Sequence, residues 1–200
     1  MSVLDRLHQW HVSGRRVRVL SQHLAKLLPE GATVLDVGAG DGSLARAVME
    51  RRPDVDVRGI EVLLRPTPHI PIEHFDGTHI PYEDRAFDAV MLVDVLHHTT
   101  GATELLREAA RVARAAVIIK DHLADARFAA VTLRFMDRVG NARFGVALPY
   151  HYWRRAEWHQ AFDEARLSVE VWRERLSLYP PIASAFFDRS LHVIARLRPL

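Results

Sequence analysis

The stretch TVLDVGAGDGSLARAV, residues 33 to 48, indicates how the chain folds. An apolar run, TVLDV, leads into a turn that holds Gly38, Gly40 and Gly42, and a helical pattern follows. A buried strand that enters a glycine turn and then a helix is typical of an open α/β sheet. Glycine accepts positive φ and lets the backbone approach a ligand, because it has no Cβ. The turn could therefore hold a pyrophosphate or a nucleoside, or it could be only a tight packing corner.

The rest of the chain alternates strands with helices. The predicted strands cover residues 32–38, 55–62, 72–75, 87–94 and 115–121, with a late antiparallel pair over 167–179 and 190–199. The predicted helices cover residues 3–28, 43–52, 101–114, 124–139 and 154–165. Gly14 divides the first helix into two, and Gly140 with Asn141 ends the fourth. This alternation predicts a doubly wound α/β sheet in a single domain over residues 1–200.

Composition narrows the partners and the compartment. The 200 residues carry a formal net charge of only +2, which argues against a nucleic-acid binder held by bulk charge. There is no cysteine, which excludes disulfides, thiolate metal sites and a cysteine nucleophile. The first residues contain no apolar signal region, and the apolar runs are too short to span a bilayer. We therefore expect a cytoplasmic protein without stable membrane insertion.

Acidic side chains lie at or near the carboxyl ends of the first four predicted strands. Asp36 lies inside the first strand, Glu61 closes the second, Asp76 follows the third and Asp94 ends the fourth. The carboxyl ends of parallel strands form the ligand crevice of an open sheet. The carboxylate of Glu61 can accept hydrogen bonds from both hydroxyls of a ribose, and that of Asp76 can accept a hydrogen bond from an exocyclic amine.

The glycine spacing separates two cofactor classes. The pattern here is G-x-G-x-G, whereas the dinucleotide fingerprint is G-x-G-x-x-G. An NAD-dependent oxidoreductase on the same topology is therefore the less favoured alternative.

The segments VLDVGAGDGSLA, GIEV and FDGTHIPYEDRAFDAVMLVDVLHHT, with the late paired strands, resemble a class I S-adenosylmethionine-dependent methyltransferase of the type 11 group. The resemblance implies a Rossmann-like, seven-stranded, mostly parallel sheet in the order 3-2-1-4-5-7-6, with strand seven antiparallel and helices on both faces. It also implies S-adenosyl-L-methionine as cofactor and S-adenosyl-L-homocysteine as product. The implied cofactor-binding residues are Asp36, Gly38, Ala39, Gly40, Gly42, Glu61, Asp76, Gly77, Asp94 and Val95.

The resemblance also divides these residues among the parts of the cofactor. The turn around Ala39 approaches the methionine and ribose, and Asp36 supports the turn and the amino end. Glu61 binds the ribose hydroxyls, and Asp76 with the backbone of Gly77 lies at the adenine amine. Asp94 and Val95 lie beside the methionyl group.

The chain departs from this family in one place. Members usually have a regular helix between strands two and three. Here residues 63–71, LLRPTPHIP, contain three prolines and cannot form a regular helix. We expect one face of the sheet to be thinner near Glu61, or to be covered by the N-terminal helix or a second subunit.

Four residues after strands four and five are candidates for catalysis. His97 and His98 follow the fourth strand, and Asp121 and His122 end the fifth. A histidine titrates near neutral pH and can act as a general base, which a carboxylate such as Asp121 can orient. The alternative is that the histidines only pack locally and that Asp121 or Asp125 caps the next helix.

The acceptor half of the site is expected in residues 122–153, with residues 1–28 as a helical lid. The aromatic residues of this cap could line an apolar or aromatic pocket, and its arginines could bind an anionic acceptor. These residues are Tyr150, His151, Tyr152, Trp153, Arg134, Arg138 and Arg143. The spacing of the twelve histidines matches no recognised ligand set, so no metal site is predicted.

The expected function is methyl transfer to O, N or C of a small-molecule acceptor by in-line displacement. A methyltransferase-like partner subunit without activity is the second alternative, and a homodimer remains open.

Overall fold

The structure, a computed structural model, describes residues 3–141, 151–180, 184, 187 and 190–200. Its strands are β1 (Thr33–Val37), β2 (Asp56–Glu61), β3 (Ile72–His74), β4 (Phe87–Val93), β5 (Ala113–His122), β6 (Leu167–Arg173) and β7 (His192–Pro199). Its helices are α1 (Val3–Ala25), α2 (Ser43–Arg51), the single 3₁₀ turn η1 (Leu96–His98), α3 (Ala102–Val112), α4 (Ala129–Asn141) and α5 (Arg155–Glu164).

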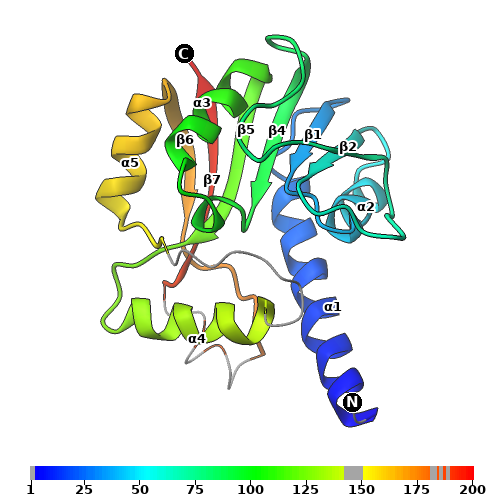
Figure 1. The fold of residues 1–200 in the computed structure, drawn as a ribbon, viewed down its shortest axis with the longest axis vertical. Helices are drawn as coiled ribbons and strands as arrows, with labels where there is room; N and C mark the ends of the chain where they lie inside the picture. Colours follow the sequence, from blue (N-terminus) through cyan, green and yellow to red (C-terminus); the bar gives the residue numbers. More distant parts are fainter. Residues whose placement is uncertain (1–2, 142–150, 181–183, 185–186, 188–189) are drawn as a thin grey trace.

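The strands form one sheet in the order β3-β2-β1-β4-β5-β7-β6 (Figure 1). Strands β1 to β5 pair in parallel, and β7 runs antiparallel to both β5 and β6. The predicted fold class and strand order are confirmed. The parallel strands end at one common edge, and α4 lies across that edge rather than on either face of the sheet (Figure 1).

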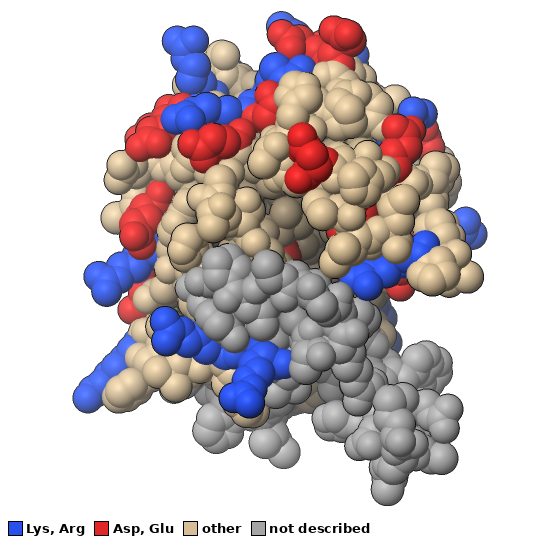
Figure 2. Space-filling view, viewed as in Figure 1, with Lys and Arg blue, Asp and Glu red and all other residues tan. Residues whose placement is uncertain are grey.

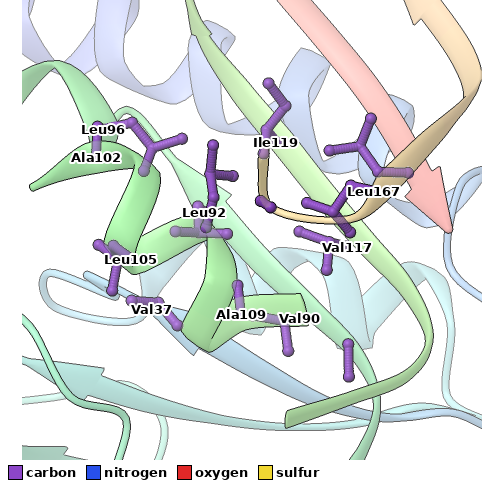
Figure 3. Close-up of a cluster of buried hydrophobic side chains, with 14 of the residues drawn as sticks. Val37, Val90, Leu92, Leu96, Ala102, Leu105, Ala109, Val117, Ile119 and Leu167 are labelled. Carbon is purple, nitrogen blue, oxygen red and sulfur yellow. The ribbon is translucent and has the colours of Figure 1, made fainter. Parts of the chain in front are cut away.

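One face of the sheet packs against α3 and α5. Alternate side chains of the central strands point to this face, among them Val90 and Leu92 of β4 and Val117 and Ile119 of β5 (Figure 3). They meet Leu105 of α3, which is also buried. Burying one such side chain contributes roughly 1.5–3 kcal/mol, so this layer is a major source of stability.

The opposite face packs against α1 and α2. The intervening residues of the same strands, such as Ala89 and Met91, contact Leu20 and Leu24 of α1 and Val48 of α2 in a second buried cluster. Central strands covered on both faces must be apolar at successive positions, which explains the continuous apolar runs of β4 and β5.

Several predicted boundaries were wrong. Helix α1 continues through Gly14, because a glycine in a helix costs only about 1 kcal/mol and does not prevent it. Helix α4 begins at Ala129 and includes Gly140 and Asn141, which were expected to end it. Strand β6 ends at Arg173 rather than at residue 179.

The misassigned end of β6 has a packing role instead. Leu176 and Leu178 are buried in the α1–α2 cluster, so their alternation reflects burial without strand pairing. The segment is bonded to α1, since Arg15 donates to the carbonyl of Ser177 and His23 Nε2 lies 3.1 Å from the carbonyl oxygen of Leu176.

The proline-rich segment between β2 and β3 forms no helix, as predicted. It covers its part of the sheet through its own residue Ile70, which is buried against the α2 side. Val62, Leu63 and Leu64 remain 42–52% exposed, so the sheet is thinly covered beside Glu61.

No helix within the described part of the chain is long and apolar enough to cross a membrane. Acidic and basic side chains are interspersed over the upper part of the face in Figure 2, which agrees with the small net charge.

Candidate active site

The glycine turn has a left-handed backbone at Gly38, Gly40 and Gly42, with φ of 71°, 61° and 77°. A Cβ on Gly38 would lie 2.6 Å from Val95 Cγ2, and one on Gly42 would lie 2.5 Å from Ile70 Cγ1. A Cβ on Gly40 would meet nothing within 4 Å. Packing therefore explains two of the glycines, whereas the backbone of Gly40 faces open space in which a ligand could lie.

Glu61 joins this turn to the end of β2. Its Oε2 accepts a hydrogen bond from the Gly40 amide at 2.8 Å, and its Oε1 accepts from the amides of Val62 and Leu63 at 2.9 and 3.1 Å. The backbone amides of Gly38 and Ala39 donate to the carbonyl of Ile60. The carboxylate thus holds the turn in shape, a role that was not predicted.

Asp36 is buried below the turn, with 3% of its surface exposed. Burial, together with the nearby charge of Glu61, raises the pKa of Asp36 to about 7. The carboxyl group therefore changes its charge near neutral pH, directly beneath the predicted cofactor site.

Asp76 forms a local turn on the surface. Its Oδ1 accepts from the amides of Thr78 and His79 at 2.7 and 2.8 Å, and from the Thr78 hydroxyl at 2.9 Å. These hydrogen bonds lower the pKa of Asp76. Gly77 follows with φ of 88°. Oδ1 is thus engaged in the turn, and binding of an adenine amine by Asp76 stays a prediction.

Asp94 follows β4 in an uncommon left-handed conformation, with φ of 58°. Its Oδ1 accepts from Lys120 Nζ, and its Oδ2 accepts from Arg16 on α1. Burial raises the pKa of Asp94, but the positive charges of Arg16 and Lys120 outweigh this and lower it. The side chain predicted beside the methionyl group is therefore tied to two cations.

His97 and Asp121 form a buried pair across the β4–β5 boundary. His97 Nδ1 lies 2.6 Å from Asp121 Oδ1, and the two side chains are 3% and 0% exposed. Burial raises the pKa of Asp121, but the charge of His97 and hydrogen bonds from His122 and His97 hold it well below its usual range. The predicted pairing of a histidine with an orienting carboxylate is present.

The other two candidates adjoin this pair. His122 Nδ1 lies 3.3 Å from His97 Nδ1, and the half-buried ring of His98 lies 3.9 Å from that of His97, centre to centre. Burial lowers the pKa of His122. The interpretation of Asp121 as a cap for α4 was wrong, because α4 starts at Ala129. The alternative cap, Asp125, binds the amide of Arg155 at the start of α5 instead.

Arg16, Lys120 and His192 were not predicted as parts of this site. Lys120 is fully buried, and burial lowers its pKa. His192 pairs with His122 across the β5–β7 register, and its Nδ1 lies 3.5 Å from Lys120 Nζ. A lone lysine inside the apolar run AAVIIKD was a signal that could have revealed this site, because a buried charge requires a partner.

The predicted acceptor cap is described only in part. Tyr152 is half-buried, and its ring centre lies 5.7 Å from that of His122 and 6.1 Å from that of His97. Trp153 packs on Trp158. His151, Arg134 and Arg138 are exposed. Tyr150 and Arg143 lie outside the described residues.

Comparison with known proteins identifies the family. A family model described as a methyltransferase domain matches residues 10–174. The chain belongs to the methyltransferase-domain family. Among curated proteins, this domain is 32% identical over 110 residues to the 27-O-demethylrifamycin SV methyltransferase of Amycolatopsis mediterranei. That match covers 48% of this chain and 40% of the relative, so the chain spans less than half of the curated protein.

Solved structures share the fold of this methyltransferase domain. A methyltransferase from Haloferax volcanii, solved with the activator Trm112, aligns with a TM-score of 0.68 and 17% identity over 96% of this chain and 91% of its own. An S-adenosylmethionine-dependent methyltransferase from Mesorhizobium loti aligns with a TM-score of 0.66 and 16% identity, over 88% and 96%.

Proposed function

We propose that this domain binds S-adenosylmethionine at the glycine turn and transfers its methyl group to a small-molecule acceptor. The proposal depends on one observation: the backbone of Gly40, which Glu61 holds by a hydrogen bond, faces open space. The family match and the methyltransferase named among the curated relatives support it. The cofactor supplies an electrophilic methyl carbon and leaves as S-adenosylhomocysteine.

The residues of the turn and of the strand ends would hold the cofactor. The left-handed backbone of Gly40 lets the chain approach a bound molecule closely, because no Cβ fills the space. Glu61 would accept the ribose hydroxyls, Asp76 with Gly77 would bind the adenine, and Asp94 with Val95 would adjoin the methionyl group. Gly38 and Ala39 would approach the methionine and ribose, and Asp36 beneath the turn would support the turn and the amino end.

The histidine cluster would serve the acceptor. The group that attacks must be aligned behind the methyl carbon, in a site that excludes water. The burial of His97, Asp121 and His122 fits such a site. With Asp121 holding His97 Nδ1, the other ring nitrogen of His97, or a nitrogen of His98 or His122, could accept a proton from an O–H or N–H acceptor.

Calorimetric titration of S-adenosylmethionine, S-adenosylhomocysteine and NADH tests the proposal. We expect the first two to bind and NADH not to bind, and we expect Glu61→Ala to weaken binding at least tenfold. Glu170→Ala, which removes a carboxylate on β6, is the matched control and should bind normally. Binding of NADH alone would support the oxidoreductase, and no binding at all would support the partner subunit.

A further inference from the structure

Four potential metal ligands converge at the carboxyl edge of the sheet, between η1 and the end of β5. Asp94, His97, Asp121 and His122 each offer one ligand atom, and these atoms all lie within 4.8 Å of one another. The sequence indicates a candidate base with an orienting carboxylate among His97, Asp121 and His122, but it predicts no metal site. The two pairs are more than twenty residues apart in the sequence and meet through the pairing of β4 with β5.

Three of these atoms lie at or near the separations of ligands on one ion. The distances are 2.6 Å from His97 Nδ1 to Asp121 Oδ1, 3.3 Å between the two histidine Nδ1 atoms, and 3.4 Å from His122 Nδ1 to Asp121 Oδ1. Ligands about 2.1 Å from a common ion, at angles between 90° and the tetrahedral value, lie roughly 3.0–3.4 Å apart. A bound ion would replace the hydrogen bond between His97 Nδ1 and Asp121 Oδ1, and only this pair would have to separate by a few tenths of an ångström.

The backbone around these ligands is held in place by hydrogen bonds. Asp121 Oδ2 accepts from the Leu96 amide at 3.0 Å, and Asp121 Oδ1 accepts from the His122 amide at 2.7 Å. The indole of Trp158 donates to the His122 carbonyl at 3.0 Å. Such outer contacts orient ligands and raise affinity for a metal.

The local charges select the class of ion. One oxygen of Asp94 binds Lys120 and the other binds Arg16. Of the two carboxylates in the cluster, Asp121 is therefore the one that can bind an ion without displacing a cation. Two imidazoles and one carboxylate on one side of an ion suit Zn²⁺, Fe²⁺ or Co²⁺, whereas Mg²⁺ and Ca²⁺ prefer oxygen ligands. Such a triad leaves coordination positions open.

We propose that His97 Nδ1, His122 Nδ1 and Asp121 Oδ1 bind one divalent transition-metal ion, which in turn binds a hydroxyl or enol oxygen of the methyl acceptor. The role of the ion rests on the proposed function, but its binding does not. The ion would lower the pKa of the acceptor O–H, whose proton would pass to His98 or to solvent. The oxygen would then form the bond to the methyl carbon as the carbon–sulfur bond breaks, with its electron pair left on sulfur.

Titration of the chelator-treated full chain with Co²⁺, followed by visible absorption, tests the site. We expect one Co²⁺ per chain, displaced by Zn²⁺ and not by Mg²⁺. His97→Gln and Asp121→Asn should each weaken binding at least tenfold. His23→Gln, which removes a half-buried histidine from α1 outside the cluster, should bind as the wild type does. Circular dichroism verifies that each variant is folded.

Absence of Co²⁺ binding would overturn the proposal, and so would equal binding by the wild type and by both ligand variants. Loss of binding in His23→Gln to the same extent would also overturn it. A parallel titration with S-adenosylhomocysteine separates the two proposals. If S-adenosylhomocysteine binds and Co²⁺ does not, the metal site is wrong and the methyltransferase function stands. The reverse result would leave the metal site and remove the function.

Discussion

At the scale of single residues, Asp36 makes stability depend on pH. Its pKa is raised to about 7 in the folded chain, whereas the unfolded carboxyl keeps its ordinary value of 3.8. The folded state therefore holds a proton that the unfolded state has lost, and stability falls as pH rises from about 4 to 7. We expect the free energy of unfolding of the wild type to fall relative to Asp36→Asn by up to about 1.4 kcal/mol per pH unit.

Urea unfolding of both proteins at pH 4, 5.5 and 7 measures this difference. Asp88→Asn serves as the control. Hydrogen bonds from Thr33 lower the pKa of Asp88 below its ordinary value of 3.8, so its pH-dependent contribution lies below about pH 4 and the difference between this variant and the wild type should stay nearly constant from pH 4 to 7. A difference between the wild type and Asp36→Asn that stays constant with pH would contradict the expectation.

At the scale of elements, the turn between β1 and α2 contains one glycine required for packing, Gly42, and one expected to contact the cofactor, Gly40. Gly40→Ala should lower the free energy of unfolding by about 1–2 kcal/mol. This is the cost of placing alanine in a left-handed backbone conformation, because the new Cβ would contact no other atom. Gly42→Ala should cost about 1–3 kcal/mol more, because its Cβ would lie 2.5 Å from Ile70. Gly40→Ala should nevertheless weaken binding of S-adenosylhomocysteine at least tenfold, since the new methyl group enters the open space.

Thermal unfolding and calorimetric titration of the two variants measure both effects. The double variant Gly42→Ala with Ile70→Ala tests whether the clash between the new Cβ and Ile70 causes the loss of stability. It should recover only part of that loss, because an alanine at φ of 77° remains strained. Normal cofactor binding by Gly40→Ala would mean that the ligand does not lie over this turn.

At the scale of the whole molecule, α1 connects one end of the chain to the centre of the site through the ion pair of Arg16 with Asp94. Arg16 is 38% exposed, so its replacement by glutamine should change global stability by less than about 1 kcal/mol. We expect Arg16→Gln to increase proteolytic cleavage within α1 on the N-terminal side of Leu20, because that part of the helix loses its ion pair with Asp94 at the sheet edge. Increased cleavage would support the predicted role of residues 1–28 as a lid.

Limited trypsin digestion with mass spectrometry follows the cleavage. Arg18→Gln removes an exposed arginine from the same helix and is the control for the lost trypsin site. Cleavage of α1 at the wild-type rate in Arg16→Gln would show that packing alone holds the helix.

The layers of the fold could be predicted from the sequence because burial leaves a periodic pattern. The alternation of apolar strands with helices predicted a doubly wound sheet, and the glycine turn after the first strand was predicted at its observed place. The same logic failed at Leu176 and Leu178, where alternation came from burial beside α1 without strand pairing.

What the sequence determined by itself is therefore the order of elements, the glycine turn and the acids at the strand ends. Each depends on properties of neighbouring residues, such as apolar periodicity and backbone freedom. Only the tertiary structure decided that Lys120 and Arg16 hold Asp94, and that the ligand atoms of His97, His122, Asp121 and Asp94 come within 4.8 Å of one another. Apolar patterning specifies which face is buried, but polar contacts between distant segments depend on strand register and side-chain direction, which local sequence does not encode.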